Sequence, residues 1–277
     1  MGSLVALLGY PLSHSVSPAM HNAAFDALDM RWRYAAMPVE PDRLPEAVTR
    51  IRGEDYTGAN VTVPHKETIV PLLDGLTPVA EAIGAVNTLV KRNGKLIGHN
   101  TDAAGLLADL AAHGIGLSHR SVLVLGAGGA ARAVVAGCAG VSAKIRVVAR
   151  RRTQAESLRR IAPVDVFDWT PLGLMQASDD CALIVNATPI GMSPHVDASP
   201  WIDGTPFPLE AFVYDLVYNP AETLLVRQAR AAGLRAATGL GMLVEQGALA
   251  FELWTGNTAP REVMRRAAEQ ALMIADF

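Results

Sequence analysis

The feature of this chain that most constrains its fold is a glycine-rich turn that joins an apolar segment to a helical one. Residues 121–125 form a short apolar run that leads directly into Gly126-Ala127-Gly128-Gly129-Ala130-Ala131. The spacing Gly-x-Gly-x-x-Ala is that of a dinucleotide-binding turn, where glycines let the backbone approach a pyrophosphate at the start of a helix. Glycine-rich turns also occur without a ligand, so the position between a strand and a helix carries the argument. The turn predicts a doubly wound parallel sheet that binds a dinucleotide.

The residues after the next expected strand indicate which dinucleotide is bound. NAD sites usually carry an acidic residue about 20 residues beyond the glycines, where it accepts a hydrogen bond from the ribose. Here the strand at 144–149 is followed by Arg150-Arg151-Arg152. Guanidinium groups can hold a 2′-phosphate through parallel charge-assisted hydrogen bonds. The alternative is a solvated basic helix start, although cations there oppose the helix dipole. The sequence therefore predicts NADP as the cofactor.

The rest of the chain alternates short apolar runs with segments of helical periodicity, which is typical of α/β proteins. Its 277 residues are enough for two ordinary domains. We expect an N-terminal α/β domain with a mixed sheet at residues 1–102, completed by C-terminal helices from 239–277. A Rossmann-type domain with a doubly wound parallel sheet is expected at 103–238.

Individual strands and helices follow from the same patterns. Asn93-Gly94 predicts a hairpin between runs 85–90 and 95–98, because this pair favours a two-residue turn. The other expected strands are 4–8, 31–39, 60–63, 121–125, 144–149, 183–185 and 213–216. Helices are expected after Ser17, before Gly114, after the glycine turn, and at 242–254 and 261–275.

Composition narrows the class of partner. Half of the residues are apolar, 18% are charged, and the formal net charge is −3. These values exclude a disordered chain and provide no basic stripe for a nucleic acid or a membrane surface. We therefore expect a small-molecule substrate, with no nucleic-acid or membrane partner.

The cysteines and the N-terminus bear on location and metal binding. Cys138 and Cys181 lie far apart and have no ligand spacing around them, which predicts buried thiols in a reducing compartment and no metal site. The apolar run 4–8 is too short for a signal-peptide core. A cytoplasmic protein is the expectation.

Polar side chains recur at strand ends in the first hundred residues. Strand alternation places Asn60 and Thr62 on one face of their segment and two valines on the other. Ser15 and Ser17 share the spacing of two, although Ser17 is explained equally well as a helix N-cap. Asn87 also lies at a strand end. These residues are candidate ligand contacts.

A charged pair and a glutamine complete the candidates. Lys66 follows Pro64 at an expected helix start, where its charge opposes the dipole unless it has an anionic partner. Asp102 precedes a helix, so N-capping is its first explanation in isolation. Gln246 lies in an apolar stripe with Met242, so its amide needs either a ligand or a backbone partner if that face is buried.

Together these segments resemble the shikimate dehydrogenase family. The matching strings are Gly9-Tyr10-Pro11-Leu12-Ser13-His14-Ser15-Val16-Ser17-Pro18 with His21-Asn22, Gly58-Ala59-Asn60-Val61-Thr62-Val63-Pro64-His65-Lys66, Gly84-Ala85-Val86-Asn87-Thr88-Leu89, Asn100-Thr101-Asp102, the glycine turn, Asn186-Ala187-Thr188-Pro189, Tyr214-Asp215-Leu216-Val217-Tyr218-Asn219-Pro220 and Gly239-Leu240-Gly241-Met242-Leu243-Val244-Glu245-Gln246. Their order from residue 9 to residue 246 makes coincidence implausible.

The resemblance implies an NADP-dependent, reversible reduction of 3-dehydroshikimate to shikimate, on the route to chorismate and the aromatic amino acids. It also implies a cleft between the two domains. Lys66 and Asp102 match the catalytic pair of the family. The matches to its substrate contacts are Ser15, Ser17, Asn60, Thr62, Asn87, Tyr218 and Gln246. The matches to its cofactor contacts are Gly126, Ala127, Gly128, Gly129, Ala130, Arg150, Arg151, Arg152, Thr153, Thr188, Leu216 and Gly239.

The chemistry agrees with these assignments. A carbonyl oxygen needs a proton as hydride reaches the carbon, and Lys66 would either donate that proton or stabilise the oxyanion. Asp102 would hold the ammonium in place and bond a neighbouring hydroxyl.

Two departures and several alternatives remain. The family commonly has asparagine where this chain has Ala149, so which arginine holds the phosphate is open, and Gly247 stands where alanine is usual. Alternatives within the enzyme class are a quinate/shikimate dehydrogenase that prefers NAD and an aminoshikimate-type relative. A non-catalytic dinucleotide-binding regulator needs neither Lys66 nor Asp102. The protein is expected to be a monomer or a homodimer.

Overall fold

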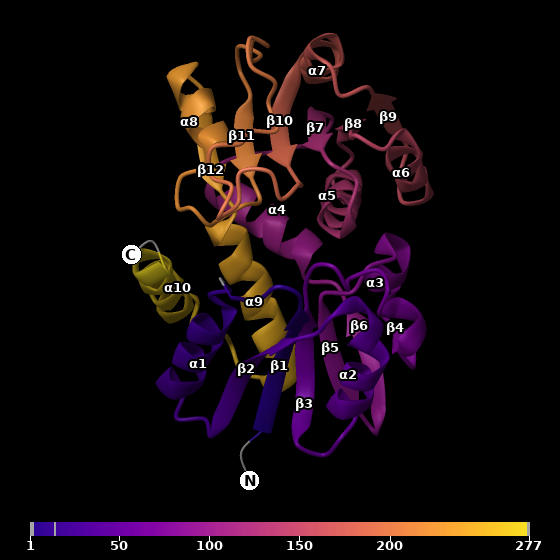
Figure 1. Cartoon of the computed structure of the whole chain (residues 1–277), viewed down its shortest axis with the longest axis vertical. Helices are drawn as coiled ribbons and strands as arrows, with labels where there is room; N and C mark the ends of the chain where they lie inside the picture. The colour runs from indigo at the N-terminus through magenta and orange to yellow at the C-terminus, as the bar shows by residue number, and fades with distance from the viewer. Residues whose placement is uncertain (1–2, 14, 276–277) are drawn as a thin grey trace. The chain divides into compact units, whose positions relative to one another are not determined.

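The computed structural model describes residues 3–13 and 15–275 and divides into two compact units (Figure 1). Unit 1 comprises residues 1–105 and 243–277, and unit 2 comprises residues 106–242. Helices α4 (Asp102–Ala112) and α9 (Leu240–Thr255) carry the chain from one unit to the other. The division lies a few residues from the expected boundaries.

Unit 1 is built on a mixed sheet of six strands in the order β2-β1-β3-β5-β6-β4. Parallel pairs join β1 to β2, β1 to β3 and β4 to β6, whereas β5 is antiparallel to both β3 and β6. The strands are β1 (Ser3–Gly9), β2 (Trp32–Pro38), β3 (Tyr56–Val61), β4 (Gly75–Leu76), β5 (Thr88–Arg92) and β6 (Lys95–His99). The helices are α1 (Ser17–Ala27), α2 (Leu44–Ile51), α3 (Pro78–Ile83) and α10 (Arg261–Ala275), with short turns η1 (Pro41–Arg43) and η2 (Val70–Leu72).

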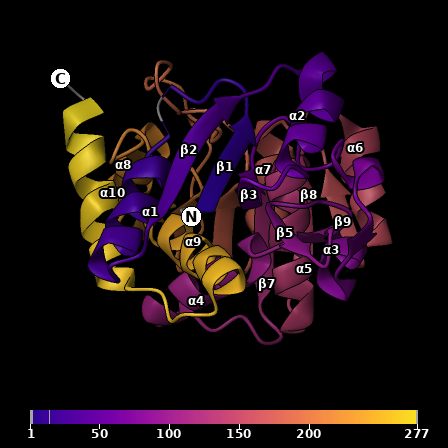
Figure 2. The ribbon, with the colours of Figure 1, turned by 90° about the horizontal axis from the view of Figure 1, so that it is seen from below.

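Both faces of this sheet are covered, because successive side chains of β1 point to opposite faces and residues 5–9 are all buried. Ala6 and Leu8 pack in one core cluster with Leu44 and Ile51 of α2. On the opposite face Gly58 of β3 lies against Trp254 of α9. Figure 2 accordingly shows α2 on one side of β1 and β3, and α1, α9 and α10 on the other.

Unit 2 is an all-parallel sheet of six strands in the order β12-β11-β10-β7-β8-β9. If the strands are numbered 1 to 6 from β7 to β12, their order from β9 to β12 is 3-2-1-4-5-6, which is that of the Rossmann fold. The strands are β7 (Ser121–Leu125), β8 (Lys144–Val148), β9 (Val164–Phe167), β10 (Cys181–Asn186), β11 (Phe212–Asp215) and β12 (Arg235–Thr238). The helices are α5 (Gly129–Gly140), α6 (Arg152–Ser157), α7 (Pro171–Ser178) and α8 (Leu224–Ala231), with the short turn η3 (Leu158–Arg160).

Successive side chains of β7 pack in two different core clusters, one on each face of the sheet. Val122 and Val124 lie in one cluster with Val134 of α5, whereas Leu123 lies in a second cluster with Leu225 of α8. A strand buried on both faces has few polar positions, which explains why 122–125, after the buried Ser121, reads as an unbroken apolar run. The expected fold class, a mixed-sheet α/β unit and a doubly wound parallel sheet, is confirmed.

Several local predictions can be compared with the structure. The hairpin is present between β5 and β6, and both Asn93 and Gly94 have the positive φ that the tight turn requires. Strand β3 ends at Val61, and Val63 is 67% exposed, so the predicted apolar face does not extend to this residue. The sequence patterns missed β4, β9 and β12, which are short edge strands, and helices α2, α3, α6, α7 and α8.

Three further observations concern packing and environment. Both cysteines are free and buried, as expected. A Cβ at Gly247 of α9 would lie 2.4 Å from Cε of Met20, so the glycine leaves room for this side chain of α1. Among residues 3–13 and 15–275, no helix combines the length and apolar character needed to cross a membrane.

Candidate active site

The polar centre of unit 1 is an ion pair between Lys66 and Asp102. Lys66 Nζ lies 2.7 Å from Asp102 Oδ2, and the two side chains are 15% and 5% exposed. Asp102 is the first residue of α4, and its carboxylate accepts hydrogen bonds from Lys66 and Asn87. The prediction that Lys66 starts a helix is wrong, because the chain there forms hydrogen-bonded turns. A helix dipole therefore does not oppose its charge, and the anionic partner is present.

Asn87 connects this pair to the rest of the unit. Its amide nitrogen lies 2.8 Å from Asp102 Oδ1, 2.8 Å from Thr101 Oγ1 and 3.2 Å from Gln246 Oε1. Its amide oxygen accepts from the Thr101 N–H at 2.8 Å and from the Thr88 hydroxyl at 3.0 Å. Because the Thr101 N–H can only donate, the Asn87 atom that it faces must be the amide oxygen. This contact fixes which way the Asn87 amide is oriented. Asn87 thus holds the carboxylate oxygen that Lys66 does not bond.

Gln246 joins the same group of residues from α9. Its amide nitrogen donates to the Leu243 carbonyl at 2.8 Å, so a backbone group provides the partner that the sequence left open. The predicted buried stripe is only partly right, because Gln246 is half-buried while Val244 and Ala248 are fully buried. One amide hydrogen and part of the oxygen of Gln246 are left for a ligand.

Asn60 is buried, and its side chain is bonded within the protein. It is 6% exposed, and its amide hydrogens are directed at the Asn87 carbonyl (3.0 Å) and at Thr88 Oγ1 (3.1 Å). Its oxygen accepts from the Tyr34 hydroxyl at 2.8 Å. Both donors are therefore used within the protein. Thr62, its expected partner on the same face, lies just past the end of β3 and is half-buried.

The two serines lie at the start of α1. The prediction that Ser17 caps the helix is wrong, because the cap position is Val16 and Ser17 is already in the first turn. Ser15 Oγ accepts from the Ser17 N–H at 3.4 Å, so Ser15 provides the local hydroxyl acceptor. Ser17 is buried at 7% exposure, whereas Ser15 is half-buried.

The glycine turn of unit 2 has the geometry of a dinucleotide site. Gly126 has φ of +110°, and a Cβ there would lie 2.8 Å from Cγ2 of Thr188. Gly128 is the N-cap of α5, and a Cβ built on it has no described atom within 4 Å. Open space in front of a helix N-terminus suits a pyrophosphate, because the first amides there lack intrahelical partners. The residues present therefore fit the cofactor that the sequence predicts.

The three arginines after β8 are not equivalent. All are exposed, but Arg152 lies 3.2 Å from Glu156 and 3.0 Å from Asp168. In the part of the chain that the structure describes, the recorded ion pairs of this triplet involve Arg152 alone. Arg150 and Arg151 are thus the better candidates for a phosphate. Thr153 follows them in α6 and is also exposed.

Buried polar side chains shape the loops after β10 and β11, and sequence reasoning gave two of them no role. Asn186 donates to Asp215 Oδ1 at 2.8 Å, and its oxygen accepts from the backbone and hydroxyl of Thr188. The Thr223 hydroxyl donates to Asp215 Oδ2 at 2.7 Å, and the Val217 N–H donates to Oδ1 at 3.0 Å. The sequence does mark Asn186 and Asp215, because each is the polar last residue of an apolar strand. The network holds Thr188 beside the glycine turn.

The remaining predicted residues of unit 2 lie on the same loops. Tyr218 and Leu216 follow β11 and are half-buried. A Cβ at Gly239 would lie 2.4 Å from the Leu216 carbonyl oxygen, so only glycine permits this approach. These loops follow the carboxyl ends of parallel strands, which is the edge where such sheets bind ligands.

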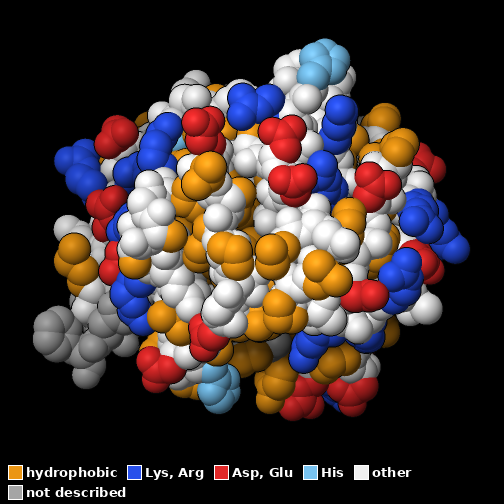
Figure 3. Space-filling model, turned by 90° about the horizontal axis from the view of Figure 1, so that it is seen from above, with side chains coloured by type: hydrophobic (Ala, Val, Ile, Leu, Met, Phe, Trp, Pro, Cys, Tyr) orange, Lys and Arg blue, Asp and Glu red, His pale blue; other side chains and the backbone are white. Residues whose placement is uncertain are grey.

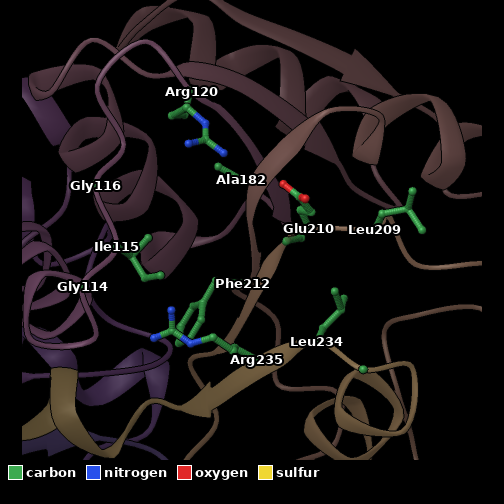
Figure 4. Close-up of a pocket in the computed structure, with 12 residues that line it drawn as sticks. Gly114, Ile115, Gly116, Arg120, Ala182, Leu209, Glu210, Phe212, Leu234 and Arg235 are labelled. Carbon is green, nitrogen blue, oxygen red and sulfur yellow. The ribbon is translucent and has the colours of Figure 1, made fainter.

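A hollow of about 330 Å³ lies at the opposite edge of the unit 2 sheet (Figure 4). It is bordered by Arg120, Phe212 and Arg235, which stand at the amino ends of β7, β11 and β12. Cζ of Arg235 lies 5.4 Å from the centroid of the Phe212 ring. The close-up shows the two side chains together. Because the glycine turn follows the carboxyl end of β7, this hollow is separate from the dinucleotide site.

Across the residues that the structure describes, the surface charge and the arrangement of possible metal ligands indicate no further site. On the face drawn in Figure 3, basic and acidic side chains are interspersed. Within the described ranges, no group of three or more His, Cys, Asp or Glu side chains is arranged to hold a metal ion.

Comparisons with known proteins indicate one family. The family described as Shikimate dehydrogenase substrate binding domain matches residues 7–89, and that described as Shikimate 5'-dehydrogenase C-terminal domain matches residues 239–269. The sequence is 46% identical over 280 residues to a protein named shikimate dehydrogenase (NADP(+)) from Symbiobacterium thermophilum, covering 98% of this chain and 95% of that protein.

Two solved structures extend the comparison. Shikimate 5-dehydrogenase from Thermus thermophilus, in complex with NADP(H) and shikimate, superimposes with a TM-score of 0.89 at 39% identity, covering 98% of this chain and 100% of the other. Ligand-free 5-ketofructose reductase of Gluconobacter gives a TM-score of 0.84 at 32% identity, covering 98% and 99%. The same fold therefore serves more than one carbonyl substrate.

The buried carboxyl of Asp215 makes unit 2 sensitive to pH. Burial raises its pKa from 3.8 to about 6, although Thr223, Val217 and Asn186 all donate to it. The folded state thus binds this proton more strongly than the unfolded state, so the stabilisation is complete below pH 3.8 and is lost as the pH rises through about 6. We expect the free energy of unfolding of the parent, relative to Asp215→Asn, to fall with a limiting slope of about 1.4 kcal/mol per pH unit in that window.

Urea unfolding followed by tryptophan fluorescence, to which Trp201 buried in unit 2 contributes, measures this difference. Because the comparison is between two proteins at each pH, groups that titrate elsewhere cancel. A difference that stays constant across the window would show that Asp215 does not titrate there.

Proposed function

Because the chain belongs to the shikimate dehydrogenase family, we propose that it catalyses the reversible NADPH-dependent reduction of 3-dehydroshikimate to shikimate, on the route to chorismate and the aromatic amino acids. The enzyme is an oxidoreductase that acts on a CH–OH group and uses NADP. The observation that carries the mechanism is the buried Lys66–Asp102 pair, which is joined through Asn87 to Gln246.

We assign the proton chemistry to this pair. In the reduction, negative charge grows on the carbonyl oxygen, and the Lys66 ammonium either donates a proton to it or stabilises it as an oxyanion. Asp102 holds the ammonium in place through Oδ2, while Asn87 fixes Oδ1. If Lys66 is the proton donor in the reduction, microscopic reversibility makes it the acceptor of the hydroxyl proton in the oxidation.

The substrate contacts are assigned to unit 1, together with Tyr218 of unit 2. A polyhydroxylated acid needs several hydroxyl and amide partners, and a site with such partners rejects analogues that lack a hydroxyl. The proposed contacts are Ser15, Ser17, Thr62, Asn87, Tyr218 and Gln246. Asn60 belongs to the same group, but its donors are used internally, so a direct contact involves only its oxygen.

The cofactor contacts are assigned to unit 2. When bound, NADPH supplies the hydride that reduces the carbonyl carbon. The proposed pyrophosphate contacts are the amides of Gly126, Ala127, Gly128, Gly129 and Ala130, where the space in front of Gly128 is open. The 2′-phosphate is assigned to Arg150 and Arg151, with Arg152 and Thr153 beside them. The proposed nicotinamide contacts are Thr188, Leu216 and Gly239.

Partners beyond these small molecules are limited to a second copy of the chain. We propose a monomer or a homodimer in the cytoplasm, without a nucleic-acid or membrane partner.

The substrate is tested by offering several carbonyl compounds with each cofactor. We expect reduction of 3-dehydroshikimate with NADPH, measured by loss of nicotinamide absorbance, at a higher kcat/KM than that of 3-dehydroquinate, 5-ketofructose or an amino analogue. Preference for 3-dehydroquinate with NADH would instead indicate the quinate/shikimate alternative. Absence of any turnover, with tight NADPH binding retained, would indicate a non-catalytic regulator.

Removal of the ammonium should abolish most of the turnover. We expect Lys66→Ala to lower kcat by a factor of about 100 or more, the usual contribution of a positioned acid or oxyanion donor. Lys95→Ala, which changes an exposed lysine of β6, is the control. Near-normal turnover of a folded Lys66→Ala protein would remove this residue from the mechanism.

Reversal of charge at position 150 should narrow the preference for NADPH. We expect Arg150→Asp to lower kcat/KM for NADPH by about tenfold or more and to leave that for NADH similar or improved, because a carboxylate repels the phosphate but accepts from a ribose hydroxyl. Arg160→Asp, at an exposed position of η3, is the matched control. Equal use of both cofactors by the parent enzyme would contradict the arginine assignment.

A further inference from the structure

The dipeptide His21-Asn22 stands out in the sequence, and the proposed chemistry gives it no role. In the structure both residues hold Tyr34 of β2. The Asn22 side chain donates to the Tyr34 carbonyl at 3.0 Å and accepts from the Tyr34 N–H at 2.8 Å. The His21 ring is stacked on the Tyr34 ring, with centroids 4.4 Å apart and an interplanar angle of 10°. Backbone and ring of Tyr34 are thus both fixed from α1.

His21 is suited to this stacking because it is uncharged. It is completely buried, and burial lowers its pKa from 6.5 to about 3. Neither ring nitrogen has a hydrogen-bond partner among the described residues. A neutral ring can lie against the phenol without placing an uncompensated charge in the core. His21 therefore holds Tyr34 by ring packing and not by a hydrogen bond.

The Tyr34 hydroxyl, in contrast, makes a directed polar contact. Tyr34 is 1% exposed, and its hydroxyl donates to Asn60 Oδ1 at 2.8 Å. With its oxygen occupied, Asn60 directs its two amide hydrogens to the Asn87 carbonyl and to Thr88 Oγ1. Because the Thr88 oxygen receives a hydrogen, its own hydroxyl hydrogen is free to bond Asn87 Oδ1, which lies at 3.0 Å.

The relay ends at the catalytic pair. The Asn87 amide oxygen is occupied by Thr88 and by the Thr101 N–H, so its nitrogen points to Asp102 Oδ1. The other oxygen of Asp102 holds Lys66. Each step from Tyr34 to Lys66 is a hydrogen bond of 2.7–3.1 Å between side chains. All of the steps lie within unit 1.

We propose that Tyr34 is a positioning residue for the dehydrogenase reaction, acting through Asn60, Thr88 and Asn87 on Asp102 and Lys66, with His21-Asn22 holding it in place. This inference rests on the proposed function. Without the phenol, Asn60 keeps a buried oxygen that lacks its partner and is free to shift, and a small displacement of a reacting group is enough to lower turnover. Asn60 is accordingly assigned an internal role, in addition to any contact with substrate.

A double-mutant cycle tests the relay. We expect Tyr34→Phe to lower kcat for shikimate oxidation by about tenfold, the factor that corresponds to loss of one buried hydrogen bond, and to leave KM for NADP⁺ within about twofold. If Tyr34 acts through Asn60, adding Tyr34→Phe to Asn60→Ala lowers kcat no further. Multiplicative effects in the double variant would overturn the proposal.

Two more variants separate positioning from stability. Ile51→Val removes one buried methylene from the other face of the same sheet and loses a comparable amount of stability, so it should lower the Tm without lowering kcat. Thr88→Val interrupts the relay between Asn60 and Asn87 and leaves Tyr34 unchanged. It should lower kcat as Tyr34→Phe does, which keeps the test available if Tyr34→Phe does not fold. A lower Tm with full kcat in Tyr34→Phe would make the role of Tyr34 purely structural.

The parent protein distinguishes failure of this inference from failure of the proposed function. A parent that oxidises shikimate, combined with unchanged kcat in Tyr34→Phe and Thr88→Val, overturns the relay alone. A parent that does not oxidise shikimate contradicts the proposed function, and the positioning role, which is defined by that reaction, fails with it.

Discussion

The contact on which the site depends is the ion pair of Lys66 and Asp102, in which the carboxylate is buried and the lysine side chain is 15% exposed. Removing two charges from water costs more than their attraction returns unless further hydrogen bonds satisfy the carboxylate. Asn87 provides such a bond, and its own oxygen is occupied by the Thr101 N–H and the Thr88 hydroxyl. An ammonium kept this close to a fixed carboxylate is suited to proton transfer, because little reorganisation is needed when charge develops beside it.

In unit 2 the ligand site is formed mainly by backbone atoms and less by side chains. Gly126, Gly128 and Gly239 each leave room that a Cβ would occupy or obstruct. Buried Asn186 and Asp215 hold the loops that surround this space by hydrogen bonds to backbone and hydroxyl groups. A cofactor that is recognised through amides needs loops that do not move, and these two side chains provide the rigidity.

Patterns that depend on neighbouring residues were predicted well. The unbroken apolar run of β7, the Asn93-Gly94 hairpin and the glycine turn each reflect local geometry, so the residues that specify them are adjacent in the chain. Short edge strands such as β9 and β12 were missed, because pairing on one side only leaves little apolar pattern to detect. At Ser17 the helix start was predicted correctly and only the cap residue was wrong, because the cap is Val16. At Lys66 no helix begins, because a nearby proline does not by itself start one.

The sequence by itself determined the fold class, the family, the dinucleotide turn and the two residues to which the proton chemistry is assigned by proposal, because these are expressed as local periodicity or as ordered strings. Only the tertiary structure decided which polar side chains face one another. Asn60 and Gln246 read as equivalent ligand contacts, yet Asn60 is enclosed by Tyr34, Asn87 and Thr88. Hydrogen-bond partners from strands and helices far apart in the chain meet only when the sheet forms, and no local pattern records that meeting.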